Sequence, residues 1–302
     1  MINFPAFRGR SPRLSLVVVC YNMARELPRT LQTLSARMQR GIGEEDYEII
    51  VVDNGSSRPA DQDACRRLGK NIRFLSTPSP NASPARAIAW GVRHARHAHL
   101  GIFIDGARMA SPGLLARARE ALSLAPDTVV GTIGFHLGDE VQMDAVHKGY
   151  DQSAEDRLLD GAGWQADGYR LFSISCLAGS SAGGWFVLPP ETNALFLSRA
   201  LFHQLGGFDE AFTSSGGGLI NHDFWNRVCE SDRARIVMLL GEGTFHQFHG
   251  GAATNARISP WQAFTEEYAR IRGRPYAPAR KAFTLYGATG HLPPRHAPQG
   301  QK

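Results

Sequence analysis

Residues 99–115 read HLGIFIDGARMASPGLL, and this stretch decides the fold. Its apolar run predicts a strand over 100–104, and that run ends on a single carboxylate, Asp105. Two small residues follow, and Ser111 and Pro112 then begin a helical pattern, since Ser favours the N-cap and Pro the first helical position. A buried strand that delivers a carboxylate into a turn and then a helix indicates an α/β sheet with a polar edge.

The same alternation of strand and helix runs through the first 135 residues. Continuous apolar runs predict buried strands over 14–20 and 48–52, and further strands are predicted over 72–76 and 128–135. Spaced leucines and Ser-Pro pairs predict helices between them, including a long one over 85–98. We therefore expect an α/β fold with a doubly wound, Rossmann-like mixed sheet flanked by helices. In such sheets ligands bind beyond the carboxyl ends of the strands.

The second half of the chain is less regular. Residues 136–190 are Gly-rich without a clear period, which predicts a substrate-facing insertion, and elements return within 193–205, 223–230, 236–240 and 260–271. We expect an N-terminal extension over 1–13, a ligand-binding half over 14–135, a second half of the same domain over 136–290 and a flexible tail over 291–302.

Composition narrows the functional classes. The 302 residues are 43% hydrophobic and 20% charged, with a net charge of +5, which is ordinary for a globular protein but also suits an anionic ligand or membrane surface. No block of like charge or DNA-binding motif is present, so we expect no nucleic-acid partner. The four cysteines are far apart, which is typical of reduced thiols in a cytoplasmic protein.

Two carboxylates, Asp53 and Asp105, end predicted strands. Each could simply cap a turn. Asp53 could instead accept hydrogen bonds from a base or ribose, and Asp105, beside Gly106, could hold Mg²⁺ or Mn²⁺ together with substrate phosphates.

A third carboxylate and two histidines lie near later elements. His246 and His249 form an HxxH motif in a Gly-rich loop after a strand, where one imidazole could complete a metal shell. Asp223 follows three glycines at a helix start, where it is either an N-cap or a general base for an acceptor hydroxyl.

Several stretches together, in their order and spacing, resemble family 2 glycosyltransferases of the GT-A type over residues 14 to about 251: LSLVVVCYN, EIIVVDNGSS, NASPARAIAWGVRHA before IFIDGA, ETNALFLSRALFHQLGGFDEAF, HDFWNRV and the late His. The resemblance implies a nucleotide-diphosphate sugar donor bound by residues 14–135, Mn²⁺ or Mg²⁺, a saccharide or lipid-linked acceptor bound by residues 136–290, and inversion at the anomeric carbon. By position it implies donor contacts at Tyr21, Asn22, Asp53, Arg86, Asp105 and Gly106, metal contacts at Asp105, His246 and His249, an acceptor side at Asn193, Gly207 and Asp209, and a base at Asp223 or His222.

The chain departs from the family pattern at two positions. Ala107 stands where the metal motif has its second carboxylate, so that metal binding is weaker, shared with a His, or absent. Asn221 stands where the base normally lies, two residues before Asp223, and an amide cannot accept the proton. The base is then Asp223 or His222, or the enzyme is impaired.

The expected function is therefore a glycosyltransferase of bacterial surface polysaccharide synthesis. We expect it in the cytoplasm, peripheral to the inner membrane face if its acceptor is lipid-linked. The alternatives are a catalytically silent nucleotide-sugar or carbohydrate-binding protein of the same fold, a sugar nucleotidyltransferase and a structural protein. CYNMARELP after the first strand lacks the Gly-rich loop of nucleotidyltransferases, which disfavours that class.

Overall fold

A mixed sheet runs through the computed structural model, which describes residues 11–251 and 259–298. Its strands lie in the order β10-β9-β6-β8-β4-β1-β2-β3, with β5 paired to β9 and β7 paired to β6. The strands are β1 Leu14–Cys20, β2 Tyr47–Asp53, β3 Ile72–Ser76, β4 His99–Phe103, β5 Arg108–Ala110, β6 Thr128–Leu137, β7 Ser175–Leu177, β8 Ala194–Ser198, β9 Arg235–His246 and β10 Phe283–Gly287. The α-helices are α1 Glu26–Leu34, α2 Gln62–Arg66, α3 Ala85–Arg93, α4 Leu114–Leu122, α5 Gln142–Ala145, α6 Gln152–Ala162, α7 Arg199–Gln204, α8 Ile220–Glu230 and α9 Trp261–Arg272.

The first half of the chain forms the predicted parallel strands. β1 pairs with β2 and with β4, so that Cys20 lies opposite Asp53 and Val18 opposite Phe103. Alternate residues of β1 enter different cores, Val17 on one face and Leu16 on the other. Burial on both faces is the physical reason for the continuous apolar run, and the predicted α/β fold class is confirmed.

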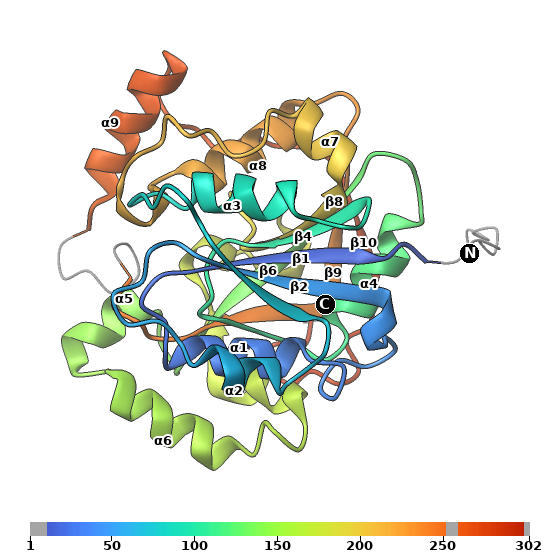
Figure 1. Ribbon diagram of the computed structural model, residues 1–302, viewed down its shortest axis with the longest axis vertical. Coiled ribbons are helices and arrows are strands. Elements are labelled where there is room, and N and C mark those ends of the chain that lie inside the picture. The colour runs from blue at the N-terminus through green and yellow to red at the C-terminus, as the bar shows by residue number, and fades with distance from the viewer. Residues whose placement is uncertain (1–10, 252–258, 299–302) are drawn as a thin grey trace.

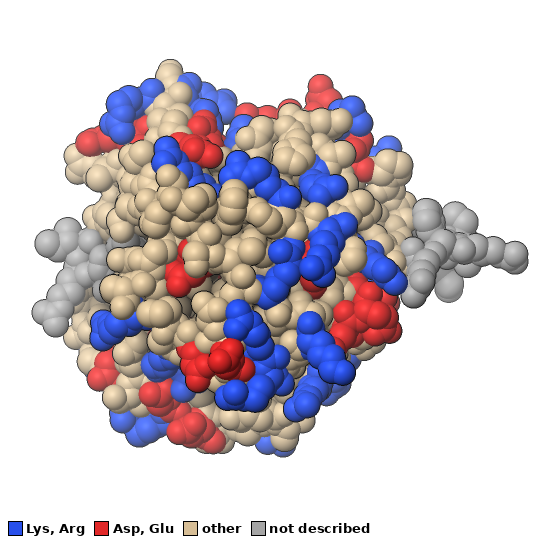
Figure 2. Space-filling model, in the orientation of Figure 1, with Lys and Arg blue, Asp and Glu red and all other residues tan. Residues whose placement is uncertain are grey.

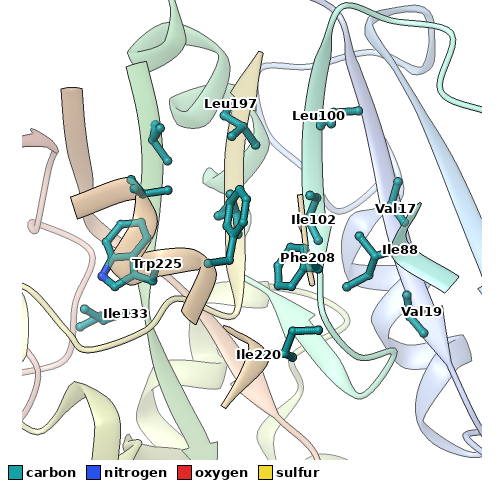
Figure 3. Close-up of a cluster of buried hydrophobic side chains, with 14 of the residues drawn as sticks. Val17, Val19, Ile88, Leu100, Ile102, Ile133, Leu197, Phe208, Ile220 and Trp225 are labelled. Carbon is teal, nitrogen blue, oxygen red and sulfur yellow. The ribbon is translucent and has the colours of Figure 1, made fainter. Parts of the chain in front are cut away.

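Helices cover both faces of this sheet. α1, α2 and α4 lie on one face and α3, α7 and α8 on the other (Figure 1). Figure 3 shows the core on the second face, where Val17 and Ile102 of the sheet lie near Ile88 of α3 and Ile220 of α8. The two predicted halves of the chain therefore share one sheet and one set of cores.

β8 runs against its neighbours and makes the sheet mixed. It pairs antiparallel with β4, where Ala194 lies opposite Phe103, and antiparallel with β6. Because the directions oppose, the start of β8 lies at the edge where β4 ends. Residues just before Ala194 are thereby brought to the edge that carries Asp105.

β9 is longer than the sequence indicates. The sequence predicted a strand over 236–240, whereas β9 continues to His246. Gly241 takes a positive φ of 82°, and a Cβ there would lie 1.9 Å from the Ala288 carbonyl oxygen. The glycine bends the strand without ending it, and β6 has a matching register shift between Gly131 and Ile133.

Residues 136–190 also contain more regular structure than predicted. They form the end of β6, α5, α6 and β7, joined by short 3₁₀ turns. Asp156 of α6 accepts hydrogen bonds from Arg25 (2.7 Å) and Arg29 (2.6 Å), which lie at and in α1. These tertiary ion pairs fix a helix whose own apolar pattern is weak.

The helix predicted over 85–98 ends early, at Arg93. The backbone beyond it is bonded by side chains from other elements: Arg73 donates to the His94 carbonyl, and Glu48 accepts from the Arg96 amide at 2.7 Å. These bonds replace helical hydrogen bonds and leave the chain room to turn into β4.

The ends of the described chain are held by side chains. Arg119 donates to the Pro12 carbonyl at 2.7 Å, and Trp185 donates to the His296 carbonyl at 2.7 Å. Residues 291–298, predicted to be part of a flexible tail, therefore pack against the body. Residues 1–10 of the predicted extension and 299–302 of the tail lie outside the described residues.

The surface mixes both signs of charge on the face that Figure 2 shows, so the net positive charge is not gathered into one field there. Among the described helices, none combines the length and apolarity that crossing a bilayer requires.

Candidate active site

The site lies at the sheet edge where β1, β2 and β4 end and β8 begins. The parallel registers of β1 with β2 and β4 bring Tyr21, Asp53 and Asp105 to this edge from three separate strands. On the other side of β4, the amide of Ile104 donates to the Asn193 carbonyl at 3.4 Å, which continues the pairing with β8. The predicted polar edge is therefore formed by residues 20–22, 53–56, 104–108 and 190–193.

Asp105, His246 and His249 come together at this edge. One ligand atom of each lies within 4.8 Å of the others, and the two Nε2 atoms of the histidines are 3.1 Å apart. His246 is buried at the end of β9, and its Nδ1 is 2.7 Å from Oε1 of Gln142, which leaves Nε2 directed at the cluster. The sequence could not choose between the two histidines, and the structure brings both to Asp105.

Arg108 joins the cluster from β5. Its Nε donates to Oδ2 of Asp105 at 2.8 Å, while the Ala107 amide donates to Oδ1 at 3.0 Å. The Arg108 side chain is only 7% exposed, and its strand pairs Arg108 with His246. A fixed positive charge therefore lies beside the carboxylate, where it would favour a bound diphosphate.

The imidazoles of the cluster are neutral at physiological pH. Burial lowers the pKa of His249 and lowers that of His246 well below its ordinary value, and the charge of Arg108 acts in the same direction. Burial, with Arg108, also lowers the pKa of His136, on β6, to about 4, while Glu191 and Asp105 act against this shift. Neutral imidazole is the form that binds a metal ion.

The predicted donor residues form a turn beside β1 and β2. Asn22 adopts a left-handed φ of 53°, and its Oδ1 accepts from the Arg58 amide at 3.0 Å. Asp53 accepts from the Ser56 amide at 2.8 Å, and Tyr21 is 55% exposed. Asn22 and Asp53 thus hold the loop, and Tyr21 is an exposed aromatic residue at the site.

Asp223 lies elsewhere and is fully engaged. Its Oδ2 accepts from Arg227 (2.8 Å) and Arg272 (2.8 Å), and its Oδ1 accepts from Arg272 at 2.5 Å. Its side chain is 1% exposed. A buried carboxylate that accepts hydrogen bonds from two guanidinium groups, one on its own helix and one on α9, is a structural ion pair. This geometry does not support the proton-accepting role expected for Asp223.

Gly207 and Asp209, two residues predicted on the acceptor side, lie beside Asp223 and its arginines and not beside the Asp105–His246–His249 cluster. Asp209 pairs with Arg272 at 2.8 Å, and the Gly207 carbonyl accepts from Arg227 at 2.7 Å. These residues line a cavity of about 660 Å³ between α3, α7, α8 and α9, and none of Asp105, His246 or His249 lines it. Arg86 of α3 is paired with Glu210 at 3.1 Å beside this cavity, so its guanidinium faces a carboxylate rather than the cluster.

A sequence model of the family described as glycosyl transferase family 2 matches residues 15–177, more than half of the chain. The chain belongs to glycosyl transferase family 2. Among curated proteins, it is 29% identical over 240 residues to a validoxylamine A glucosyltransferase of Streptomyces hygroscopicus subsp. jinggangensis, covering 70% of this chain and 51% of that protein. A second such enzyme, from subsp. limoneus, is 28% identical and 47% covered. The chain thus spans about half the length of the curated relatives it matches.

Solved glycosyltransferase structures share the fold of this family 2 chain. S. aureus TarS, residues 1–349 in complex with UDP, matches with a TM-score of 0.52 at 14% identity, over 88% of this chain and 67% of that one. GalNAc-T7 with UDP, GalNAc and Mn²⁺ matches with a TM-score of 0.54 at 12% identity, over 87% and 48%. The α/β sheet with flanking helices is therefore the GT-A fold.

The donor set of this family 2 protein fits a divalent cation. The cluster offers a carboxylate oxygen and two neutral imidazole nitrogens, a combination that suits Mn²⁺ better than Mg²⁺, which prefers oxygen alone. Ala107, at the position of the missing second carboxylate, is fully buried in the core that contains α1 and α4. His246 at the end of β9 and His249 just after it offer the ligand atoms that this position lacks.

Sequence reasoning missed four residues of the site. Gln142 and Glu155 lie in the segment without a readable pattern: Gln142 orients His246, and Glu155 accepts from the Phe248 amide at 2.7 Å. Arg108 and Glu191 had a usable signal in the sequence, since Arg108 follows Asp105 by three positions and Glu191 precedes the start of β8 by three. Oε2 of Glu191 accepts from Asn221 at 2.7 Å.

Proposed function

We propose that this protein transfers a sugar from a nucleoside diphosphate sugar to an acceptor hydroxyl, with inversion at the anomeric carbon. The observation that carries the proposal is the Asp105–His246–His249 cluster at the carboxyl edge of a family 2 sheet. A divalent cation held there would neutralise the negative charge that develops on the leaving diphosphate. Mn²⁺ is the ion we propose.

Residues around the cluster would bind the other parts of the donor. Tyr21 offers an exposed ring on which a base can stack, and Asp53 lies at the adjacent strand end. Arg108 places a second positive charge beside the diphosphate position. His246 is kept neutral by burial and oriented by Gln142, so it is ready to bind a cation without losing a proton.

The choice of donor follows from the relatives. The curated relatives are named as glucosyltransferases and the TarS structure contains UDP, so UDP-glucose is the donor to test first. A saccharide or a lipid-linked saccharide is the proposed acceptor class. Surface polysaccharide synthesis and contact with a membrane stay predictions from the sequence resemblance.

The test is the melting temperature of the protein with UDP, with and without Mn²⁺. Ligand at about 100 times its dissociation constant stabilises the folded state by about 2.7 kcal/mol. We expect His249→Ala to abolish the Mn²⁺-dependent part of the shift and to leave the ligand-free melting temperature nearly unchanged, because this ring is only partly buried. His147→Ala, an exposed histidine, is the matched control.

A Mn²⁺-dependent shift that survives both His249→Ala and Asp105→Asn would contradict the metal site. Assays of product release distinguish a transferase from a silent binding protein and from a nucleotidyltransferase. Release of UDP from UDP-glucose in the presence of saccharide acceptors supports the transferase, a shift without turnover indicates a silent binding protein, and pyrophosphate release from UTP and glucose 1-phosphate indicates a nucleotidyltransferase.

A further inference from the structure

A carboxylate that was not among the predicted site residues, Glu191, lies at the sheet edge that carries Asp105. Glu191 precedes β8, and Phe103 lies opposite Ala194 in the antiparallel pair of β4 with β8. Continuing that register places Asp105 beside residue 192, one position from Glu191. The charges of both carboxylates act on His136, whose ring centroid is 5.5 Å from that of His246.

Polar partners hold Glu191 without neutralising it. Its Oε2 accepts from Nδ2 of Asn221 at 2.7 Å, and Nδ1 of His222 is 3.6 Å away. Asn221 also donates to Oδ1 of Asn193 at 3.2 Å. Within residues 11–251 and 259–298, no Arg or Lys forms an ion pair with Glu191, which contrasts with the two arginines on Asp223.

The side chain of Glu191 is charged and accessible. Burial would raise its pKa, but nearby His222 and Arg108, together with hydrogen bonds from Asn221 and Ser180, outweigh burial and lower the pKa. Its side chain is 17% exposed, so a small reactant can reach it, whereas the side chain of Asp223 is 1% exposed. The Nδ1 atom of His222 is buried with no hydrogen-bond partner, which leaves a polar group aimed at the same carboxylate.

We propose that Glu191 is the general base of the transfer, an assignment that rests on the proposed function. The acceptor hydroxyl gives its proton to the Glu191 carboxylate as its oxygen bonds to the anomeric carbon. The bond from that carbon to the diphosphate breaks, and its electron pair leaves with the nucleoside diphosphate. Asn221, which cannot accept the proton itself, is a positioning residue that holds Oε2 of Glu191.

The experiment measures kcat for UDP release from UDP-glucose, with water in place of the unidentified acceptor, alongside the UDP and Mn²⁺ thermal shift. Glu191→Gln keeps the size and the polar contacts of the side chain but removes its basicity. Because a general base contributes about 10²–10⁴-fold, we expect kcat to fall at least about tenfold while the thermal shift stays at the wild-type value. A smaller fall overturns the assignment.

The hydrogen bond between Glu191 and Asn221 also allows a second test, in which the carboxylate and the amide exchange positions. In the double variant Glu191→Gln/Asn221→Asp the amide and the carboxylate exchange places across the 2.7 Å hydrogen bond, so the charge moves by one hydrogen-bond length. We expect this variant to recover turnover at least about tenfold above Glu191→Gln, a gain within the range of a general base. The double variant also keeps the test valid if Glu191→Gln alone is unstable, since it keeps one carboxylate and one amide in the hydrogen-bonded pair.

The outcomes separate this inference from the function on which it rests. A wild-type protein that turns over UDP-glucose as fast as Glu191→Gln refutes the base and leaves the transferase intact. A wild-type protein that neither binds UDP with Mn²⁺ nor releases UDP refutes the proposed function, and the assignment of Glu191 falls with it.

Discussion

Replacing Asp223 by Asn tests whether this residue supports the fold or the chemistry. The substitution keeps the shape of the side chain but removes the charge that two guanidinium groups share. Arg227 comes from the same helix, α8, and Arg272 from the end of α9, so the carboxylate joins two helices. The structure therefore predicts a loss of stability and no loss of chemistry.

The magnitude follows from the burial of the ion pairs. Removing one partner of a buried pair costs about 3–5 kcal/mol. The side chains of Arg227 and Arg272 are 23% and 24% exposed and keep other acceptors, among them Gly207 and Asp209, so the lower end applies, about 3 kcal/mol. With an unfolding entropy of about 2.1 cal/mol/K per residue over 302 residues, this lowers the melting temperature by about 5 °C.

The assay combines thermal unfolding with UDP-glucose turnover at a temperature well below the transition. We expect Asp223→Asn to melt about 5 °C lower and to keep kcat within about twofold of wild type. Asp209→Asn is the control, because it removes only the partly exposed Arg272 pair, which is worth about 1 kcal/mol or less. An unchanged melting temperature with turnover abolished would refute the reasoning and return Asp223 to the chemistry.

Two further substitutions test other parts of the structure. Tyr21→Ala should weaken UDP binding by about 1–3 kcal/mol without lowering the melting temperature, because the ring is exposed and stacks only when a base is bound; equal UDP affinity in a calorimetric titration would contradict this. Glu48 accepts hydrogen bonds from Ser15, Arg73 and the Arg96 amide. Burial alone would raise the pKa of Glu48, but these bonds outweigh it and lower the pKa, so its contribution to stability is present above about pH 4.5 and lost as the pH falls further. Glu48→Gln should therefore cost about 1.5–3 kcal/mol in urea unfolding at pH 7 and much less at pH 3, and an equal cost at both would refute it.

The hydrophobic pattern of the sequence predicted strands well where successive residues are buried. The run at 14–20 matches β1 residue for residue, because a strand buried on both faces must be apolar throughout. The run at 72–76 also matches β3, although β3 is an edge strand and mostly only partly buried. The pattern failed where tertiary contacts replace local ones. α6 depends on Arg25 and Arg29, and α3 ends early because Glu48 and Arg73 bond the backbone that follows it.

The residues of the candidate site also divide into those that local sequence predicted and those that only tertiary contacts revealed. Local sequence alone placed Asp105 at the end of a buried strand and two histidines after another, since strand ends and Gly-rich turns are local features. The tertiary structure was needed to show that both histidines meet Asp105, that Arg108 lies beside it, that two arginines pair with Asp223, and that Glu191 lies at the strand-end edge that carries Asp105. The reason is physical: those outcomes depend on which strands become neighbours and in which direction they run, and the reversal of β8 is set by packing across the whole sheet.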